Sequence, residues 1–316
     1  MDLVLKQKLF FWIEKYLFFP NYLQRIVSFL LLPITCLYIL IILLKRAFSK
    51  AIDYNIPIIS VGNIVVGGSG KTPITIELAK RYKNVCIILR GYKRESKGLV
   101  IVSLNGKILV DVKTSGDEAM LLAKALNNAS IIVSENRVTA ILKAKELDCK
   151  VIFLDDGFSK YSIKKFDILL KSKKEPTNNF CLPSGAYREP KSFYNKANLI
   201  LQEEKDFKRI VNILIDNSIV QIPQNALLLT AISKPTRLLE FLPKDIKTVF
   251  FEDHHIFTQE EINKIKDDYK DVAIIITHKD YVKLQEFNIE NLYIMDLSIK
   301  INNQALSTID SYINNY

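Results

Sequence analysis

The chain has 316 residues, a formal net charge of +10 and four cysteines. This length exceeds that of a usual single domain and predicts two globular lobes with a smaller extra segment. The basic balance suits an acidic partner, which can be a nucleotide, a nucleic acid or an anionic membrane surface. Because the cysteines lie far apart and mostly in apolar runs, the sequence indicates neither a Cys-x-x-Cys metal site nor a disulfide framework, and a reducing compartment is expected.

The N-terminal segment, residues 1–50, is expected to attach the protein to a membrane. Residues 26–44 contain no charged side chain, and a helix over this run would be roughly 28 Å long, close to the hydrocarbon thickness of a bilayer. Pro33 is tolerable in a membrane helix and awkward in a soluble one. Residues 9–23 mix aromatic and charged side chains, which is typical of an interfacial helix. The alternative for 26–44 is a buried helix of the soluble core.

A phosphate-binding loop is predicted where the next apolar strand ends. Gly67, Gly68 and Gly70 let consecutive backbone N–H groups converge on one anion. Lys71 would reach the β and γ phosphates of a nucleotide, and the Thr72 hydroxyl would bind Mg²⁺. The alternative is an ordinary glycine-rich turn.

Strands and helices alternate on both sides of this loop. We expect strands over 56–61, 85–89, 99–102, 107–112, 131–133, 151–154, 166–170 and 198–201. We expect helices over 72–82, 119–126 and 135–147. The alternation predicts an α/β core domain over 51–203, with a mostly parallel, P-loop NTPase-like sheet that has helices on both faces.

Carboxylates occupy two positions where chemistry is plausible. Asp155 and Asp156 follow a buried strand, which is where a Walker-B-type Mg²⁺ ligand belongs, although a solvated turn is the alternative. Asp117 opens a helix, and at such a position it can be a cap that offsets the macrodipole.

A second alternating series predicts a smaller α/β lobe over 204–316. Its expected strands cover 226–232, 248–251, 272–277 and 292–295, and its expected helices cover 235–241, 258–269 and 306–313. The cleft between the two lobes is the default place for a substrate site.

All three histidines of the chain, His254, His255 and His278, fall in this second lobe. Asp253 precedes the His254-His255 pair and can fix a histidine tautomer, which favours a catalytic role over a structural one. Zinc binding is disfavoured because no third ligand has matching spacing.

Taken together, the motifs resemble those of the tetraacyldisaccharide 4′-kinase family in the same order. They are GGSGKTP at 67–73, RGYKR at 90–94, GDE at 116–118, LDDGF at 154–158, PSGAYREP at 183–190, DHH at 253–255 and THKD at 277–280. The resemblance covers nearly the whole chain, including the N-terminal segment.

This resemblance implies transfer of the ATP γ-phosphate to the 4′-hydroxyl of a tetraacyldisaccharide 1-phosphate, giving lipid IVA in lipid A biosynthesis. It implies ATP and Mg²⁺ as cofactors and a lipid disaccharide 1-phosphate as substrate. It also implies an inner-membrane location with the catalytic lobes on the cytoplasmic face. A monomer without a nucleic-acid partner is expected.

The resemblance also implies roles for individual residues. Asp117 would be the catalytic base, assisted by His254, and Lys71 would act on the phosphates. The implied nucleotide contacts include Ser69 beside Lys71 and Thr72. The implied metal ligands are Thr72, Asp155, Asp156 and Glu189. The implied substrate or phosphate contacts are Tyr92, Glu118, Arg137 and Arg188.

Three positions depart from the usual family pattern. Ser159 and Lys160 replace the polar pair of DDGFQH, and His278 replaces the glutamate of TEKD. These departures affect nucleotide or sugar contacts and leave the phosphate and metal residues in place.

Two other functions are compatible with parts of the sequence. A membrane-attached P-loop switch or partition-type ATPase would hydrolyse ATP without an acceptor, and it has no evident use for Asp117 paired with the histidine motif. A nucleic-acid binder is motivated by the charge alone, since no nucleic-acid module is recognisable.

Overall fold

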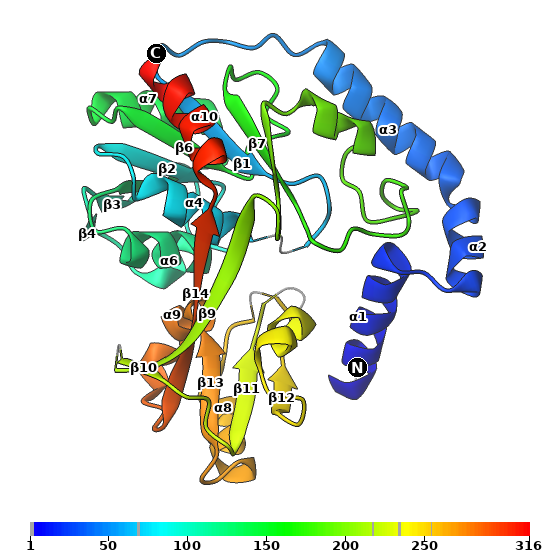
Figure 1. Cartoon of the computed structure of the whole chain (residues 1–316), viewed down its shortest axis with the longest axis vertical. Coiled ribbons are helices and arrows are strands. Elements are labelled where there is room, and N and C mark those ends of the chain that lie inside the picture. The colour runs from blue at the N-terminus through cyan, green and yellow to red at the C-terminus, as the bar shows by residue number, and fades with distance from the viewer. Residues whose placement is uncertain (1–2, 68–69, 217, 233–234, 254) are drawn as a thin grey trace.

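The computed structural model describes residues 3–67, 70–216, 218–232, 235–253 and 255–316. Two lobes, each built on its own sheet, lie one above the other, and the N-terminal helices extend to one side of them (Figure 1). Both sheets are mostly parallel and carry helices, which confirms the predicted α/β class.

The N-terminal segment forms three helices, α1 (Leu3–Phe18), α2 (Tyr22–Leu30) and α3 (Leu32–Ala47). The prediction of one continuous helix over 26–44 is wrong, because α2 and α3 meet at a 57° bend. Pro33 explains the break: it lies in the first turn of α3, where its missing N–H is not needed. No single helix in the described ranges is long and apolar enough to cross a membrane, and the bent α2–α3 pair passes such a test only as a pair.

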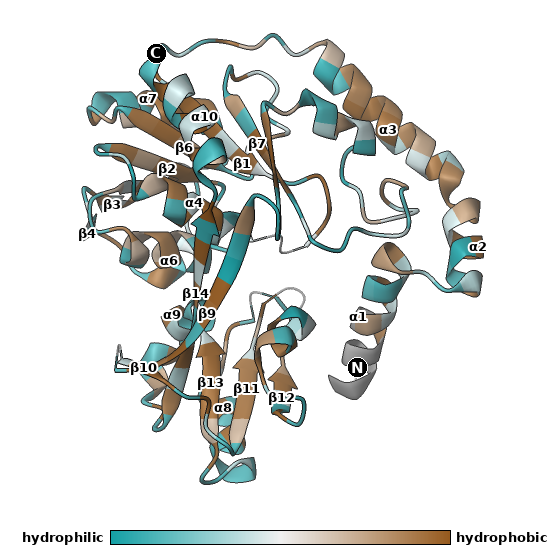
Figure 2. Ribbon diagram, viewed as in Figure 1, coloured by the Kyte–Doolittle hydropathy of each residue, from teal (hydrophilic) through white to brown (hydrophobic). Residues whose placement is uncertain are grey.

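Helix α3 is fastened to the upper lobe along one side only. The Thr35 and Ser184 hydroxyl groups are 2.7 Å apart, and the Tyr38 hydroxyl donates to the Arg188 carbonyl at 2.8 Å. The opposite side is apolar and exposed, and α3 is accordingly drawn mostly as hydrophobic in Figure 2. Its exposed apolar side chains are Ile34, Leu37, Leu40, Ile41, Leu43 and Leu44.

The upper lobe contains an eight-stranded sheet in the order β4-β3-β5-β2-β6-β1-β7-β8. The strands are β1 (Ile58–Gly62), β2 (Val85–Leu89), β3 (Val100–Leu104), β4 (Lys107–Ile108), β5 (Ser130–Val133), β6 (Val151–Asp155), β7 (Phe166–Lys171) and β8 (Leu199–Gln202). The helices are α4 (Lys71–Ala79), α5 (Val112–Ser115), α6 (Asp117–Ala125), α7 (Arg137–Glu146) and η1 (Lys191–Lys196). All pairings are parallel except those of β3, which runs antiparallel to β4 and β5.

Helices cover both faces of this sheet, as predicted from its continuous apolar strands. Ile59 of β1 packs in one core cluster together with α4 and α6, whereas its neighbour Ile58 packs in another cluster with α7. The carboxyl ends of the parallel strands β1 and β6 therefore lie side by side, and they carry the phosphate loop and the Asp155-Asp156 pair.

The lower lobe contains a six-stranded sheet in the order β10-β9-β14-β13-β11-β12. The strands are β9 (Phe207–Ile215), β10 (Ser218–Val220), β11 (Ala226–Thr230), β12 (Lys247–Phe250), β13 (Ala273–Thr277) and β14 (Leu292–Ile301). The helices are η2 (Pro235–Phe241), α8 (Gln259–Asp268), α9 (His278–Leu284) and η3 (Gln285–Phe287). The helix predicted over 235–241 is a 3-10 helix.

The long antiparallel pair β9 and β14 joins the two lobes (Figure 1). At its upper end Phe207 and Ile301 belong to the core of the upper lobe, and at its lower end Ile213 and Met295 belong to a core of the lower lobe. Sequence reasoning missed β9 and expected only the first part of β14, because charged residues interrupt the apolar pattern of both.

The C-terminal helix α10 (Asn303–Asn314) returns to the upper lobe, although the predicted boundary places residues 204–316 together. Ile309 is fully buried in the upper core, and the Tyr312 hydroxyl donates to the Ile58 carbonyl at 3.2 Å. Asp310 forms an ion pair with Arg81 at 2.8 Å. The last helix therefore closes the core of the first lobe and ties the end of β14 to it.

We predict that Ile309→Ala destabilises the whole upper lobe by about 2–5 kcal/mol, because it leaves a cavity in a close-packed core. Denaturant unfolding measures this change in the free energy of unfolding. Ser307→Ala on the exposed side of the same helix is the control and should cost less than about 0.5 kcal/mol. Equal effects of the two changes would contradict the packing described for α10.

Candidate functional site

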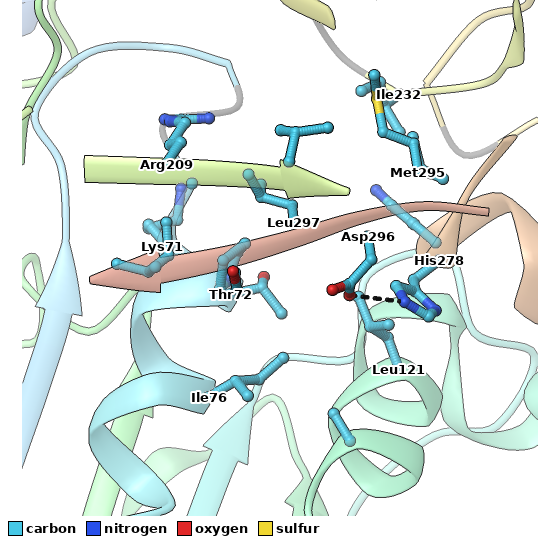
Figure 3. A pocket seen from close by; sticks show the side chains of 18 of the residues that line it. Lys71, Thr72, Ile76, Leu121, Arg209, Ile232, His278, Met295, Asp296 and Leu297 are labelled. Carbon is cyan, nitrogen blue, oxygen red and sulfur yellow. Dashed lines mark hydrogen bonds and ion pairs between the residues drawn. The ribbon is translucent and has the colours of Figure 1, made fainter. Parts of the chain in front are cut away.

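A cavity of about 690 Å³ lies between the lobes. The start of α4 and one side of α6 line it from the upper lobe, and β14, β9 and the start of α9 line it from the lower side. In Figure 3 Lys71 and Thr72 lie beside Arg209 at one end, and His278 and Asp296 lie at the other. A cavity of this size and position is the default candidate for a ligand site.

The phosphate loop leads directly from β1 into α4. Gly70 caps α4 with a φ of 80°, a backbone conformation that glycine adopts without strain. The free N–H groups of the first turn of α4 point toward an anion at the helix start, and Lys71 is the first residue of that helix. Gly67 lines the cavity with Gly70, whereas the predicted contacts Gly68 and Ser69 lie outside the described residues.

Asp156 is held by cations beside the loop. Its two oxygens accept hydrogen bonds from both terminal nitrogens of Arg188 at 2.9 Å, and Lys71 Nζ lies 4.0 Å from Oδ1. Burial acts to raise the pKa of Asp156, but Lys71 and Arg188 outweigh it and lower the pKa to about 2. Asp156 is therefore ionised and fixes the two cations next to the phosphate loop.

Asp155 has a different environment, since it is 5% exposed. Burial and the charge of Glu118 raise the pKa of Asp155 to about 7, against the opposing effect of Lys71. Its Oδ1 has no hydrogen-bond partner among the described residues, whereas Arg137 lies behind it and donates to the Ser134 carbonyl at 2.6 Å. A buried carboxylate oxygen without a partner fits a site that a cation completes.

Glu189 lies apart from these two carboxylates in its contacts. It accepts a hydrogen bond from the Tyr161 hydroxyl, and burial raises the pKa of Glu189 despite the nearby Arg46. In the described part of the chain no group of three or more histidine, cysteine, aspartate or glutamate side chains is arranged to hold a metal. Mg²⁺ does not need such a cage, because it commonly uses one or two carboxylates with substrate phosphates and water. Asp155 and the Thr72 hydroxyl fit that pattern.

Asp117 is the first residue of α6 and is buried at the boundary between the lobes. Its Oδ1 accepts the Glu118 backbone N–H at 2.9 Å, while two lysines of α9, Lys279 and Lys283, approach Oδ2. Asp117 therefore accepts a backbone N–H at the start of α6, as a cap would, and also pairs with lysines of the other lobe. These lysines were missed by sequence reasoning, although their i, i+4 spacing placed them on one helical face.

The histidine motif divides into residues with different environments. His254 lies outside the described residues. His255 Nε2 lies 3.0 Å from Glu261 Oε2, and its ring stacks on Phe251 at 4.6 Å between centroids, so His255 has a structural role in the lower lobe. Asp253 reaches the upper lobe through Lys93, whose Nζ donates to the Asp253 carbonyl at 3.1 Å.

The remaining predicted contacts are distributed around this region. Glu118 lines the cavity, Arg137 and Arg188 support the Asp155-Asp156 pair, and Tyr92 is 57% exposed. Burial and, after it, the charge of Arg137 lower the pKa of Lys160, one of the departures from the family pattern.

Two further groups of the cavity were not predicted. Arg209 on β9 lies against the phosphate loop and pairs with Glu203 at 2.6 Å. His278 Nε2 lies 3.0 Å from Asp296 Oδ1 in the cavity (Figure 3), so the departure at His278 is matched by a carboxylate on β14.

Comparison with known proteins relates the whole chain to one family. The family described as LpxK, tetraacyldisaccharide-1-P 4′-kinase, matches residues 27–314. A tetraacyldisaccharide 4′-kinase of Aliarcobacter butzleri (strain RM4018) is 68% identical over 313 residues, which cover 99% of this chain and 100% of the relative. A protein of the same name from Helicobacter pylori (strain ATCC 700392 / 26695) is 46% identical over 96% of this chain and 95% of its own length. The crystal structure of LpxK from Aquifex aeolicus in complex with ATP has a TM-score of 0.71 and 28% identity, covering 91% of this chain and 99% of that one.

We predict that Gly70→Ala weakens ATP binding at least tenfold. A Cβ atom at Gly70 would lie 2.9 Å from Arg209 Nη2, in addition to the strain of a side chain at a φ of 80°. Gly98→Ala is a matched control, since Gly98 has a φ of 73° and open space around its Cβ position. Calorimetric titration with ATP should show near-normal affinity for the control, and normal affinity for Gly70→Ala would contradict the site.

Proposed function

The chain belongs to the tetraacyldisaccharide-1-P 4′-kinase family, and we propose that it transfers the γ-phosphate of ATP to the 4′-hydroxyl of a tetraacyldisaccharide 1-phosphate. The product would be lipid IVA of lipid A biosynthesis. The observation that carries the proposal is the cavity between the lobes, because it joins the phosphate loop and the start of α6 in one continuous space. Phosphoryl transfer needs this arrangement of nucleotide, cations and acceptor.

Lys71 and the start of α4 would bind the phosphates of ATP and offset their charge. Arg188 and Asp156 keep Lys71 in place, since Asp156 contacts both cations. Asp155 and Thr72 would hold Mg²⁺, which would supply charge neutralisation for the phosphates when bound. Arg209 lies on the opposite side of the loop and would limit the space available to the nucleotide.

Asp117 would act as general base on the acceptor. Its carboxylate would take the proton of the 4′-hydroxyl while a bond forms between the 4′-oxygen and the γ phosphorus. The bond from that phosphorus to the β–γ bridging oxygen breaks, and ADP leaves. His254 follows Asp253 in the sequence and would assist Asp117, as the family resemblance implies.

The membrane attachment proposed for the enzyme rests on α2 and α3. Their exposed apolar side chains form a surface whose contact with water is unfavourable and whose burial in lipid is favourable. The acylated substrate would itself lie in a bilayer. We place this surface on the inner membrane with both lobes on the cytoplasmic face, where ATP is available. The bend between α2 and α3 is compatible with helices lying in the interface as well as with a broken span.

We predict that the purified protein in detergent phosphorylates a tetraacyldisaccharide 1-phosphate with ATP and Mg²⁺, and that Asp117→Asn lowers kcat by about 10²–10⁴-fold with ATP affinity nearly unchanged. A neutral amide keeps the shape of Asp117 and cannot accept the proton. Transfer of radiolabelled phosphate to the lipid measures the reaction.

Two controls accompany this assay. Asp111→Asn changes the exposed N-cap of the neighbouring helix α5 and should leave kcat within about twofold, because asparagine still caps the helix and only an exposed charge is lost. An acceptor that already carries a 4′-phosphate should not be labelled. ATP turnover that proceeds equally without acceptor would contradict the kinase and favour a P-loop switch or partition-type ATPase.

We predict that replacing both Leu37 and Ile41 with aspartate releases most of the protein from membranes. These exposed residues lie one helical turn apart on α3, and charge on this face opposes its burial in lipid. Flotation with anionic vesicles measures binding. Ile219→Asp, at a 69% exposed position of β10, is the control and should not change flotation. Retention of the double variant on vesicles would assign attachment to another surface.

A further inference from the structure

Helix α9 presents two lysines, Lys279 and Lys283, to the boundary between the lobes. They are one helical turn apart and therefore on one face of the helix, which packs against α6. Their side chains are 15% and 10% exposed. Lysine side chains are almost never this buried without charged partners, so the groups that pair with these two lysines indicate what the lysines do.

Lys279 joins carboxylates of both lobes. Its Nζ lies 3.2 Å from Asp253 Oδ1, 3.6 Å from Glu118 Oε1 and 3.7 Å from Asp117 Oδ2. Burial acts to lower the pKa of Lys279, but the three carboxylates outweigh it and raise the pKa. Lys279 is thus a charged group that holds the start of α6 next to the loop that carries the histidine motif.

Lys283 connects the same two segments by different contacts. Its Nζ lies 4.0 Å from Asp117 Oδ2 and donates a hydrogen bond to the His255 carbonyl at 3.1 Å. Lys279 therefore contacts the loop at Asp253, and Lys283 contacts it at His255. Both also reach the same oxygen of Asp117.

The helix that carries the lysines is firmly placed in the lower lobe. Asp280 is fully buried and accepts hydrogen bonds from the Thr230 hydroxyl at 2.6 Å, the Ala231 N–H at 2.9 Å and the Thr277 hydroxyl at 2.7 Å. These bonds tie α9 to the ends of β11 and β13. The two lysines therefore project from a helix that is firmly bonded to the lower lobe.

Stabilising the contact between the two lobes does not by itself explain why these two lysines are buried there. Removing two ammonium groups from water costs several kcal/mol each, and apolar contacts of similar volume generally join surfaces at least as well. The lower lobe meets the upper lobe elsewhere through the β9–β14 pair, which provides such apolar contacts. Charge is needed where a specific carboxylate must keep its position and orientation.

We infer that Lys279 and Lys283 are positioning residues for phosphoryl transfer, which hold Asp117 Oδ2 in place and tie it to Asp253 and to the His255 backbone. This inference rests on the proposed role of Asp117 as base. When Asp117 takes the proton of the acceptor hydroxyl, both lysines keep their own protons, and Lys279 stays paired with Glu118 and Asp253. The lysines act through Asp117 and need no contact with the acceptor.

The experiment compares Lys279→Met and Lys283→Met in the full-length enzyme. Methionine keeps much of the length of the side chain and removes its charge. We expect kcat to fall about 10–100-fold, as for a misplaced catalytic group, while the dissociation constant for ATP changes less than about threefold. Lys279→Arg and Lys283→Arg should recover part of the lost kcat, because they restore the cation.

The matched control is Lys266→Met in α8 of the same lobe. Lys266 also donates to backbone carbonyls, those of Phe287 and Asn288 at 3.5 and 3.2 Å, but it touches neither Asp117 nor the histidine motif. Its kcat should stay within about twofold of the unmodified enzyme. Unfolding temperatures of all variants show whether any loss of kcat follows a loss of stability.

Two outcomes would overturn the inference. The lysines have no positioning role if both methionine variants keep full kcat, or if kcat and ATP affinity fall together in step with the unfolding temperature. Asp117→Asn separates this inference from the proposed function. An inactive Asp117→Asn with fully active lysine variants rejects the lysines alone, whereas a fully active Asp117→Asn rejects the base on which the inference rests.

Discussion

The antiparallel pairing of β9 with β14 is the constraint on which the site depends. The two strands share a continuous register from Phe207 opposite Ile301 to Leu214 opposite Ile294, and their ends are buried in different cores. Neither lobe can shift along the pair without breaking this register. The pair therefore prevents the lobes from sliding past one another along the strands. It also places Arg209 against the phosphate loop and Asp296 at the far end of the cavity.

Beside the phosphate loop, burial and charge give two neighbouring carboxylates different properties. Asp156 contacts Arg188 and Lys71 and stays ionised. Asp155 is almost fully buried, and burial together with the charge of Glu118 raises its pKa to about 7. Adjacent residues at one strand end thus serve different purposes: Asp156 orders cations and Asp155 leaves an oxygen available to a metal ion. The two residues also differ in backbone conformation, since Asp155 ends β6 whereas Asp156 follows it with a φ of 54°.

The sequence was sufficient for the parts of the fold that local patterns determine. The strand predicted over 85–89 is β2, and Gly70, Lys71 and Thr72 occupy the helix start expected of them. The missed parts depend on tertiary contacts. The apolar alternation of β9 is interrupted by Lys208, which is exposed, and by Arg209, which is half-buried beside Glu203. The α2–α3 bend lies near Pro33, and α3 then contacts Ser184 through Thr35. Lys279 falls in the THKD motif and has an i, i+4 spacing to Lys283, but the sequence did not indicate their partners. Asp117 lies more than a hundred residues away in the sequence, and Asp253 lies on a separate loop.

The distribution of functional groups between the lobes has a chemical consequence. The phosphate loop, the Asp155-Asp156 pair and Asp117 all belong to the upper lobe, so this lobe carries most of the residues proposed to bind the nucleotide and to act as base. The carboxylates of Asp117 and Glu118 are adjacent in the sequence, and positive charge offsets both of them. Helix α9 supplies that charge from the lower lobe through two lysines. The structure thereby makes the environment of the base depend on contact between the lobes, at the same boundary that encloses the substrates.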